Sequence, residues 1–207
     1  MKFLGLILFF WCISIFANSN KLTKEEKTKL REEFRYLATF NIKYGKEWKE
    51  VGSKKTLHMD CSNTVKFVFQ KLFGLNLPRS SYDQYLFVKN LGNLSTPPLL
   101  PNGQVDSSEL EKKLKVGDLL FWINTHSDIP KDRYPPIGHV MVYLGKTKSG
   151  NLKMGGASTF GPGERTKNGG VDIFPFDPNA KIGCVKDSRK NCVKMSMFVG
   201  FGKPKIR

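Results

Sequence analysis

Residues 60–84 read DCSNTVKFVFQKLFGLNLPRSSYDQ, and this stretch decides the fold. Its apolar residues recur at helical spacing, which predicts an amphipathic helix over residues 62–73 that ends at Gly74. Cys61 stands at the predicted start of that helix. Because a helix N-terminus carries partial positive charge and unpaired N–H groups, it favours a thiolate over a thiol. Cys61 is therefore a candidate nucleophile.

A candidate base follows in the segment GHVMVYLG at residues 138–145. Aliphatic residues stand at every second position here, which predicts a strand with Val140 and Val142 on one face and His139 on the other. Imidazole can accept the proton of a thiol and return it to a leaving amine, so Cys61 and His139 together would suit covalent acyl chemistry. The residue types alone leave the alternative of a buried inert cysteine and a structural histidine.

The order of the predicted elements indicates the fold class. Residues 20–45 read as a helix that begins with Thr23 and Glu26 in a capping box. Ser81 and Gln84 predict a second capping box that opens a third helix, and residues 93–111 read as a surface loop. Strands are predicted at residues 118–124, 139–144, 152–158, 171–174 and 194–201. We therefore expect one α+β domain in which N-terminal helices pack on an antiparallel sheet.

Residues 1–19 have the form of a secretory signal peptide. Lys2 gives a short basic region, residues 3–16 are apolar, and Ala17-Asn18-Ser19 places small residues at a cleavage site. The apolar stretch is short for a membrane span, and an uncleaved anchor is the alternative. We therefore expect an exported protein, periplasmic or extracellular in the cell wall, with no stable membrane span after cleavage.

Three cysteines remain once residues 1–19 are removed. Cys184 and Cys192 flank a polar segment, a pattern that predicts a loop closed by a disulfide in an exported protein. Cys61 is then the unpaired thiol, either buried and inert or reactive. No group of Cys and His residues has the spacing of a zinc site, so we expect no metal and no cofactor.

The net charge of the chain is +16, from 34 basic and 18 acidic residues, and only Lys2 of these lies in the predicted signal peptide. Such a charge implies attraction to acidic partners, which could be wall polymers, anionic lipid headgroups or nucleic acid. Export argues against nucleic acid. We therefore expect a monomer that binds peptidoglycan or another acidic envelope polymer, and a basic surface without a specific ligand is the alternative.

Five motifs in a fixed order resemble the NlpC-type cell-wall hydrolases, a papain-like family of cysteine peptidases. They are Asp60-Cys61-Ser62, Leu77-Pro78-Arg79-Ser80-Ser81 with Gln84, Val116–Phe121, Gly138–Gly145 and Ala157-Ser158. The resemblance implies a papain-like catalytic domain at residues 46–207, preceded by the helical segment at residues 20–45. It also implies hydrolysis of amide bonds in peptidoglycan stem peptides, often between D-glutamate and a diamino acid.

The resemblance further assigns roles to single residues. Cys61 would be the nucleophile and His139 the general base. Asp60 and Ser62 match positions that bind the free amino end of the substrate, although Asp60 would also serve as a helix N-terminal charge. Tyr44 partially matches an upstream tyrosine that contributes to substrate binding in the family.

Two positions depart from the family pattern. Asn63 stands where the family usually has glycine, so we expect a side chain that narrows the groove or alters the substrate. Gly156 stands where a polar residue, often histidine, normally orients the base. Ser158 is the candidate substitute, with Asn151, His126 or a water molecule as alternatives.

Two other functions fit the same scaffold. Gly156 and the positive charge suggest a catalytically weak or inactive wall-binding protein. A papain-like acyltransferase or amidase with a non-wall substrate would use the same thiol. Turnover that depends on Cys61 separates the enzymes from the binding protein, and product analysis with added amine acceptors separates transfer from hydrolysis.

Overall fold

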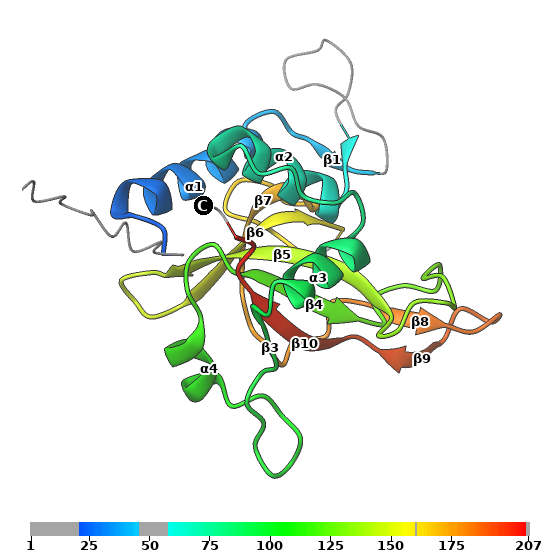
Figure 1. Cartoon of the computed structure of the whole chain (residues 1–207). Helices are drawn as coiled ribbons and strands as arrows, with labels where there is room; N and C mark the ends of the chain where they lie inside the picture. The colour runs from blue at the N-terminus through cyan, green and yellow to red at the C-terminus, as the bar shows by residue number, and fades with distance from the viewer. Residues whose placement is uncertain (1–20, 46–57, 160, 206–207) are drawn as a thin grey trace, which may run out of the picture.

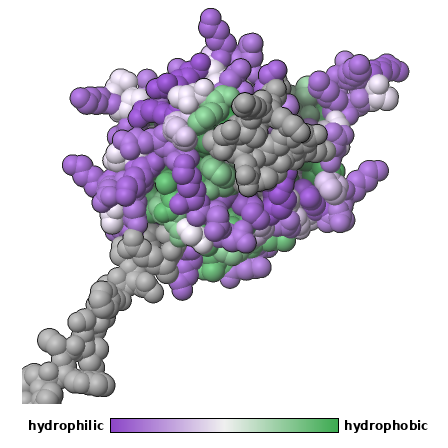
Figure 2. Space-filling model, turned by 90° about the horizontal axis from the view of Figure 1, so that it is seen from above, coloured by the Kyte–Doolittle hydropathy of each residue, from purple (hydrophilic) through white to green (hydrophobic). Residues whose placement is uncertain are grey.

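The structure, a computed structural model, describes residues 21–45, 58–159 and 161–205 (Figure 1). The predicted signal peptide at residues 1–19 lies outside the described residues, and the division at residues 45 and 46 stays a prediction. None of the helices in the described part of the chain is long and apolar enough to cross a membrane. The face seen from above carries mostly hydrophilic side chains (Figure 2).

Four helices and a six-stranded sheet form the body of the described chain. The helices are α1 Lys24–Ala38, α2 Cys61–Phe73, α3 Ser81–Asn90 and α4 Ser107–Lys113. The strands are β1 Lys43–Tyr44, β2 His58–Met59, β3 Leu94–Ser95, β4 Leu119–Ile123, β5 Ile137–Lys146, β6 Leu152–Ser158, β7 Gly170–Pro175, β8 Cys184–Lys186, β9 Cys192–Met195 and β10 Met197–Gly202. The large sheet has the order β3-β10-β4-β5-β6-β7, and each neighbouring pair is antiparallel. The predicted α+β class is confirmed.

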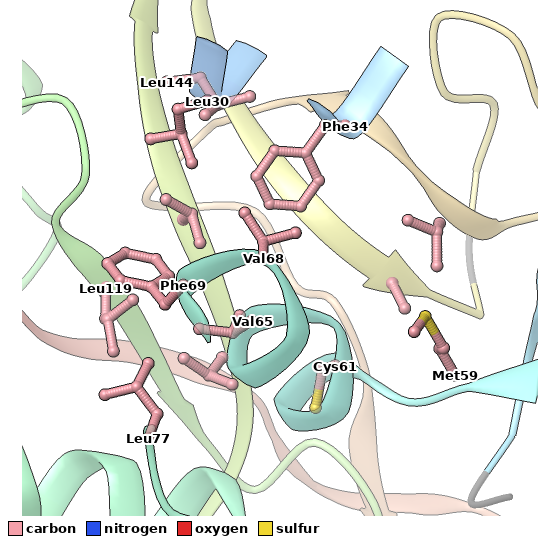
Figure 3. Close-up of a cluster of buried hydrophobic side chains, with 14 of the residues drawn as sticks. Leu30, Phe34, Met59, Cys61, Val65, Val68, Phe69, Leu77, Leu119 and Leu144 are labelled. Atoms are coloured by element: carbon pink, nitrogen blue, oxygen red, sulfur yellow. The ribbon is translucent and has the colours of Figure 1, made fainter. Parts of the chain in front are cut away.

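The large sheet is buried on both faces, and β5 shows this most clearly. Val140 and Val142 belong to the cluster that also holds side chains of α1, α2 and α3. Met141 and Tyr143 belong to a second cluster, with side chains of α4, on the other face. Figure 3 shows Cys61 at the start of α2, beside the helix residues that enter the first cluster. The packing of α2 on β5 therefore brings the cysteine to the strand that carries His139.

Several element boundaries differ from the sequence expectation. The Thr23 capping box is confirmed, but α1 ends at Ala38, because Asn41 turns the chain with a φ of 50°. Ser80 caps α3 in place of the expected Ser81, accepting a hydrogen bond from the backbone N–H of Asp83.

Several short elements were not expected, among them β1, which lies within the predicted helix at residues 20–45. The predicted loop at residues 93–111 contains β3 and most of α4, and Asp106 caps α4 by accepting from two backbone N–H groups. The predicted strand at residues 194–201 is two strands, β9 and β10, separated at Ser196. The Ser196 hydroxyl is buried and accepts a hydrogen bond from the backbone N–H of Ile182, which holds the break in place.

A glycine in β6 allows α1 to approach the sheet. A Cβ at Gly155 would lie 2.5 Å from Cδ2 of Phe34, a fully buried residue of α1. Real Cβ atoms do not approach so closely, so the ring occupies the space that any side chain at residue 155 would need. The absence of a side chain there is thus a packing requirement.

We expect Gly155→Ala to lower the free energy of unfolding by about 1–3 kcal/mol, because the new methyl group displaces the Phe34 ring. Urea unfolding of Gly155→Ala, Phe34→Leu and the double variant measures the coupling between the two positions. The penalty of Gly155→Ala should be smaller in the Phe34→Leu background. Additive penalties would contradict this account of the contact.

Candidate active site

Cys61 is the first residue of α2, and its sulfur lies against β5. Cys61 is 4% exposed. The backbone N–H groups of Val140 and Ser62 donate to the sulfur, and the Tyr44 hydroxyl donates to it across 3.8 Å. The contact with Val140 places the sulfur at the residue that follows His139.

His139 and Cys61 line the same cavity. His139 is 8% exposed, and its ring meets the Trp122 indole edge to face with 5.9 Å between the ring centroids. The cavity has a volume of about 490 Å³. The cavity is also lined by the other predicted site residues, Tyr44, Asp60, Ser62 and Ser158. A substrate carbonyl in this cavity could therefore reach a thiol and an imidazole carried by a helix and a strand.

Asp60 has three kinds of donor around its carboxylate. Asp60 caps α2 because its Oδ1 accepts from the backbone N–H of Asn63 at 2.8 Å, and the Ser62 hydroxyl donates to the same oxygen at 3.1 Å. Arg79 Nη2 pairs with Oδ2 at 2.7 Å, and Nη1 donates to Ser62 Oγ at 2.9 Å. Asp60 therefore serves both as a helix cap and as part of the cavity wall.

Arg79 is a cavity residue that sequence reasoning did not single out as functional. It lies in the motif between α2 and α3, where its pattern alone indicates a structural role. The signal that could have found it is its charge, because Asp60 is an acidic residue that needs a partner in a partly buried site.

Asn63 does not narrow the cavity. The residue is 1% exposed, and it is not among the residues that line the cavity. In the described part of the chain its Nδ2 has no hydrogen-bond partner. The expected effect on the groove is therefore not found, and this departure from the family pattern lies behind the cavity wall.

Gly156 leaves no room for an orienting side chain on β6. A Cβ there would lie 2.5 Å from the sulfur of Met141, which sits two residues after His139 on the same strand. Met141 thus fills the space that a side chain at residue 156 would need. The lack of a side chain at residue 156 and the large side chain of Met141 therefore belong to one packing arrangement.

The proposed substitutes for the orienting residue lie in different places. Ser158 and His126 both line the cavity, from the end of β6 and from the loop between β4 and β5. Asn151 lies in the turn between β5 and β6, where its backbone N–H donates to Thr147, and it is not among the cavity residues. Ser158 and His126 therefore remain the candidates on geometry.

The loop between β4 and β5 is held by a disulfide-linked hairpin. Cys184 and Cys192 are joined, with 5.6 Å between their Cα atoms, across the β8–β9 pair. The Ser127 hydroxyl accepts from the backbone N–H of Lys186 at 2.8 Å and donates to its carbonyl at 3.3 Å. The hairpin therefore braces the loop that contributes His126 to the cavity.

Burial favours the neutral forms of both the Cys61 thiol and the His139 imidazole. Desolvation, supported by the nearby charge of Asp60, raises the pKa of the Cys61 thiol to about 11 in spite of the backbone donors to its sulfur. Desolvation, with a further contribution from the charge of His126, lowers the pKa of His139 to about 4. In the unliganded site, loss of hydration therefore outweighs the N–H groups that donate to the sulfur, and the expected preference for a thiolate is not found.

A known protein family matches the sequence. The sequence pattern described as the NlpC/P60 family matches residues 45–158, more than half of the chain. No curated protein matches the sequence. Among solved structures, the wild-type endolysin LysIME-EF1 is 12% identical with a TM-score of 0.39; the alignment covers 86% of this chain and 64% of the endolysin. A TM-score below 0.5 does not establish a shared fold, so the family match carries the comparison.

We expect the rate of Cys61 alkylation by iodoacetamide to keep rising with pH toward about 11, because the thiolate is the reacting form and burial raises the pKa. The rate should be measured on mature protein with the disulfide intact, beside the same protein in denaturant, whose thiol should titrate near 8.5. A rate that is already constant at neutral pH would show a thiolate–imidazolium pair and contradict this prediction.

Acid should destabilise the fold through His139. Its folded pKa of about 4 lies below the unfolded value, so its contribution is present above pH 6.5 and is lost as the pH falls toward 4. The loss should be on the order of 3 kcal/mol. Urea unfolding of the wild type and His139→Asn across this range measures it. The two curves should converge at low pH, and parallel curves would contradict the assignment.

Proposed function

Because the chain belongs to the NlpC/P60 family, we propose that it is an exported cysteine hydrolase that cleaves amide bonds in peptidoglycan stem peptides. The observation that carries the proposal is that Cys61, at the start of α2, and His139, on β5, line the same cavity. The predicted signal peptide, the disulfide and the net charge of +16 support an exported protein with an acidic partner.

The proposed reaction begins from a thiol and a neutral imidazole. As the Cys61 sulfur attacks the substrate carbonyl, an S–C bond forms and the thiol proton passes to His139. Backbone N–H groups at the start of α2 stabilise the oxyanion. His139 then returns the proton to the leaving amine as the C–N bond breaks, and a water molecule hydrolyses the thioester by the reverse proton transfers.

The start of α2 provides the proposed contacts for the substrate amino end. Asp60 and Ser62 share hydrogen bonds with each other and with Arg79, so their oxygens are held in fixed positions on the cavity wall. The ammonium group would approach Asp60, and Tyr44 would border the substrate beside the sulfur. In this arrangement Arg79 is a positioning residue for Asp60.

Digestion of purified peptidoglycan tests the reaction. We expect mature wild-type protein to release peptide fragments, Cys61→Ala to release none, and His139→Gln to be slower by about 10²–10⁴-fold because the general base is lost. Chromatography and mass spectrometry of the fragments identify the bond. Product that is unchanged in Cys61→Ala would refute the proposal.

A catalytically weak or inactive wall-binding protein is the second candidate, and the contact between Gly156 and Met141 favours it. No side chain from residue 156 can orient the base, since Met141 fills that space. Loss of base orientation slows catalysis strongly in triad enzymes. Pelleting with insoluble wall that survives Cys61→Ala, without cleavage by the wild type, would support this function.

The double variant Gly156→His with Met141→Gly tests whether base orientation limits the rate. We expect roughly a tenfold or larger rise in kcat/KM, because an orienting histidine then has space beside His139. Gly156→His alone should be destabilised and no more active, because its side chain meets the Met141 sulfur. If the double variant folds with wild-type stability and shows no gain, another group already orients the base.

A further inference from the structure

A second cavity adjoins the Cys61 cavity and shares two of its residues. Its volume is about 740 Å³, and it lies among the end of α1, β1 and the segment before β7. Tyr44 and Thr159 line both cavities. A ligand that extends from the Cys61 sulfur past Tyr44 would therefore enter this second cavity.

The second cavity is basic. Lys43, Arg165 and Lys167 line it, and none of the described residues in its lining is acidic. The acidic residue next to Arg165 along the chain is occupied elsewhere: Glu164 pairs with Arg35 at 3.4 Å and with Lys153 at 3.3 Å. Within the described residues, no ion pair joins these three cations to a carboxylate.

The segment that carries two of these cations is held in a defined shape. Asp172 is fully buried, and its Oδ2 accepts from the backbone N–H groups of Arg165 and Thr166 and from the Thr166 hydroxyl, at 2.7–2.9 Å. The backbone N–H of Glu164 donates to the carbonyl of Ile173 at 2.9 Å. The cations are thus presented from an ordered backbone, which reduces the entropy lost when a ligand binds.

We propose that this second cavity is a subsite for an anionic group of the wall substrate, held by Arg165, Lys167 and Lys43. The identity of the ligand rests on the proposed function, because peptidoglycan stem peptides carry free carboxylates beside the amide bonds. Phosphate groups of an anionic wall polymer share the same chemistry and are the other source. Anions and cations at a partly open site attract each other in a salt-dependent manner.

Binding measurements in the Cys61→Ala background separate recognition from cleavage. The probes are a synthetic γ-D-glutamyl stem peptide with free carboxylates, the same peptide with its carboxylates amidated, and poly(glycerol phosphate). We expect the acidic peptide to bind roughly tenfold more tightly than the amidated one, with a difference that shrinks as ionic strength rises. Tighter binding of poly(glycerol phosphate) than of both peptides would assign the subsite to polymer phosphate.

A matched pair of double variants locates the effect. Arg165→Gln with Lys167→Gln should abolish the preference for the anionic probe. Lys113→Gln with Lys148→Gln removes the same charge from exposed positions outside the cavity and should retain it. Equal affinities in both double variants, or no preference for either anionic probe in the parent, would overturn the subsite.

Cleavage by protein with Cys61 intact distinguishes this proposal from the proposed function. Anion binding that depends on Arg165 and Lys167, without cleavage of any peptide, would refute the hydrolase and retain the subsite. Cleavage of acidic and amidated peptides with equal kcat/KM, in both double variants, would retain the hydrolase and refute the subsite.

Discussion

The carboxylate of Asp60 fixes the geometry on which the site depends. It ends the extended chain and starts α2 by accepting from the N–H of Asn63, so that Cys61 becomes the first helical residue. The same carboxylate holds Ser62 and pairs with Arg79. Its negative charge raises the pKa of both reactive groups, which favours the neutral form of the Cys61 thiol and the protonated form of the His139 imidazole. One residue thus links helix capping, substrate contact and proton distribution.

Local patterns were sufficient to predict the main elements. The Thr23 capping box, the stop at Gly74 and the alternation of β5 depend on neighbours in the chain, and the structure has each of them. The predictions failed where contacts between residues distant in the chain determine the structure. The spacing of Ser81 and Gln84 predicts a capping box, but the Gln84 amide donates to the carbonyls of Ser62 and Pro78, and Ser80 caps the helix.

In the candidate site, too, some features follow from local sequence and others depend on contacts between distant segments. The sequence predicts, from the motifs around them, that Cys61 and His139 belong to the site, and both residues line the cavity. It does not reveal that Asn63 lies behind the wall or that Met141 fills the space beside Gly156, since both facts depend on packing between distant segments. The pKa values were missed for a related reason. A helix dipole can be inferred from local sequence, whereas loss of hydration depends on everything that covers the group.

The bonds between Ser127 and Lys186 make the disulfide hairpin a support for the cavity wall. A Cβ at Gly183, next to Cys184, would lie 2.2 Å from the carbonyl oxygen of Thr125, so the hairpin meets the wall without an intervening side chain. Oxidation of Cys184 and Cys192 closes the hairpin that presses on this wall. In a reducing compartment the hairpin would lose this covalent link, so the support that it gives to the cavity wall depends on where the chain folds.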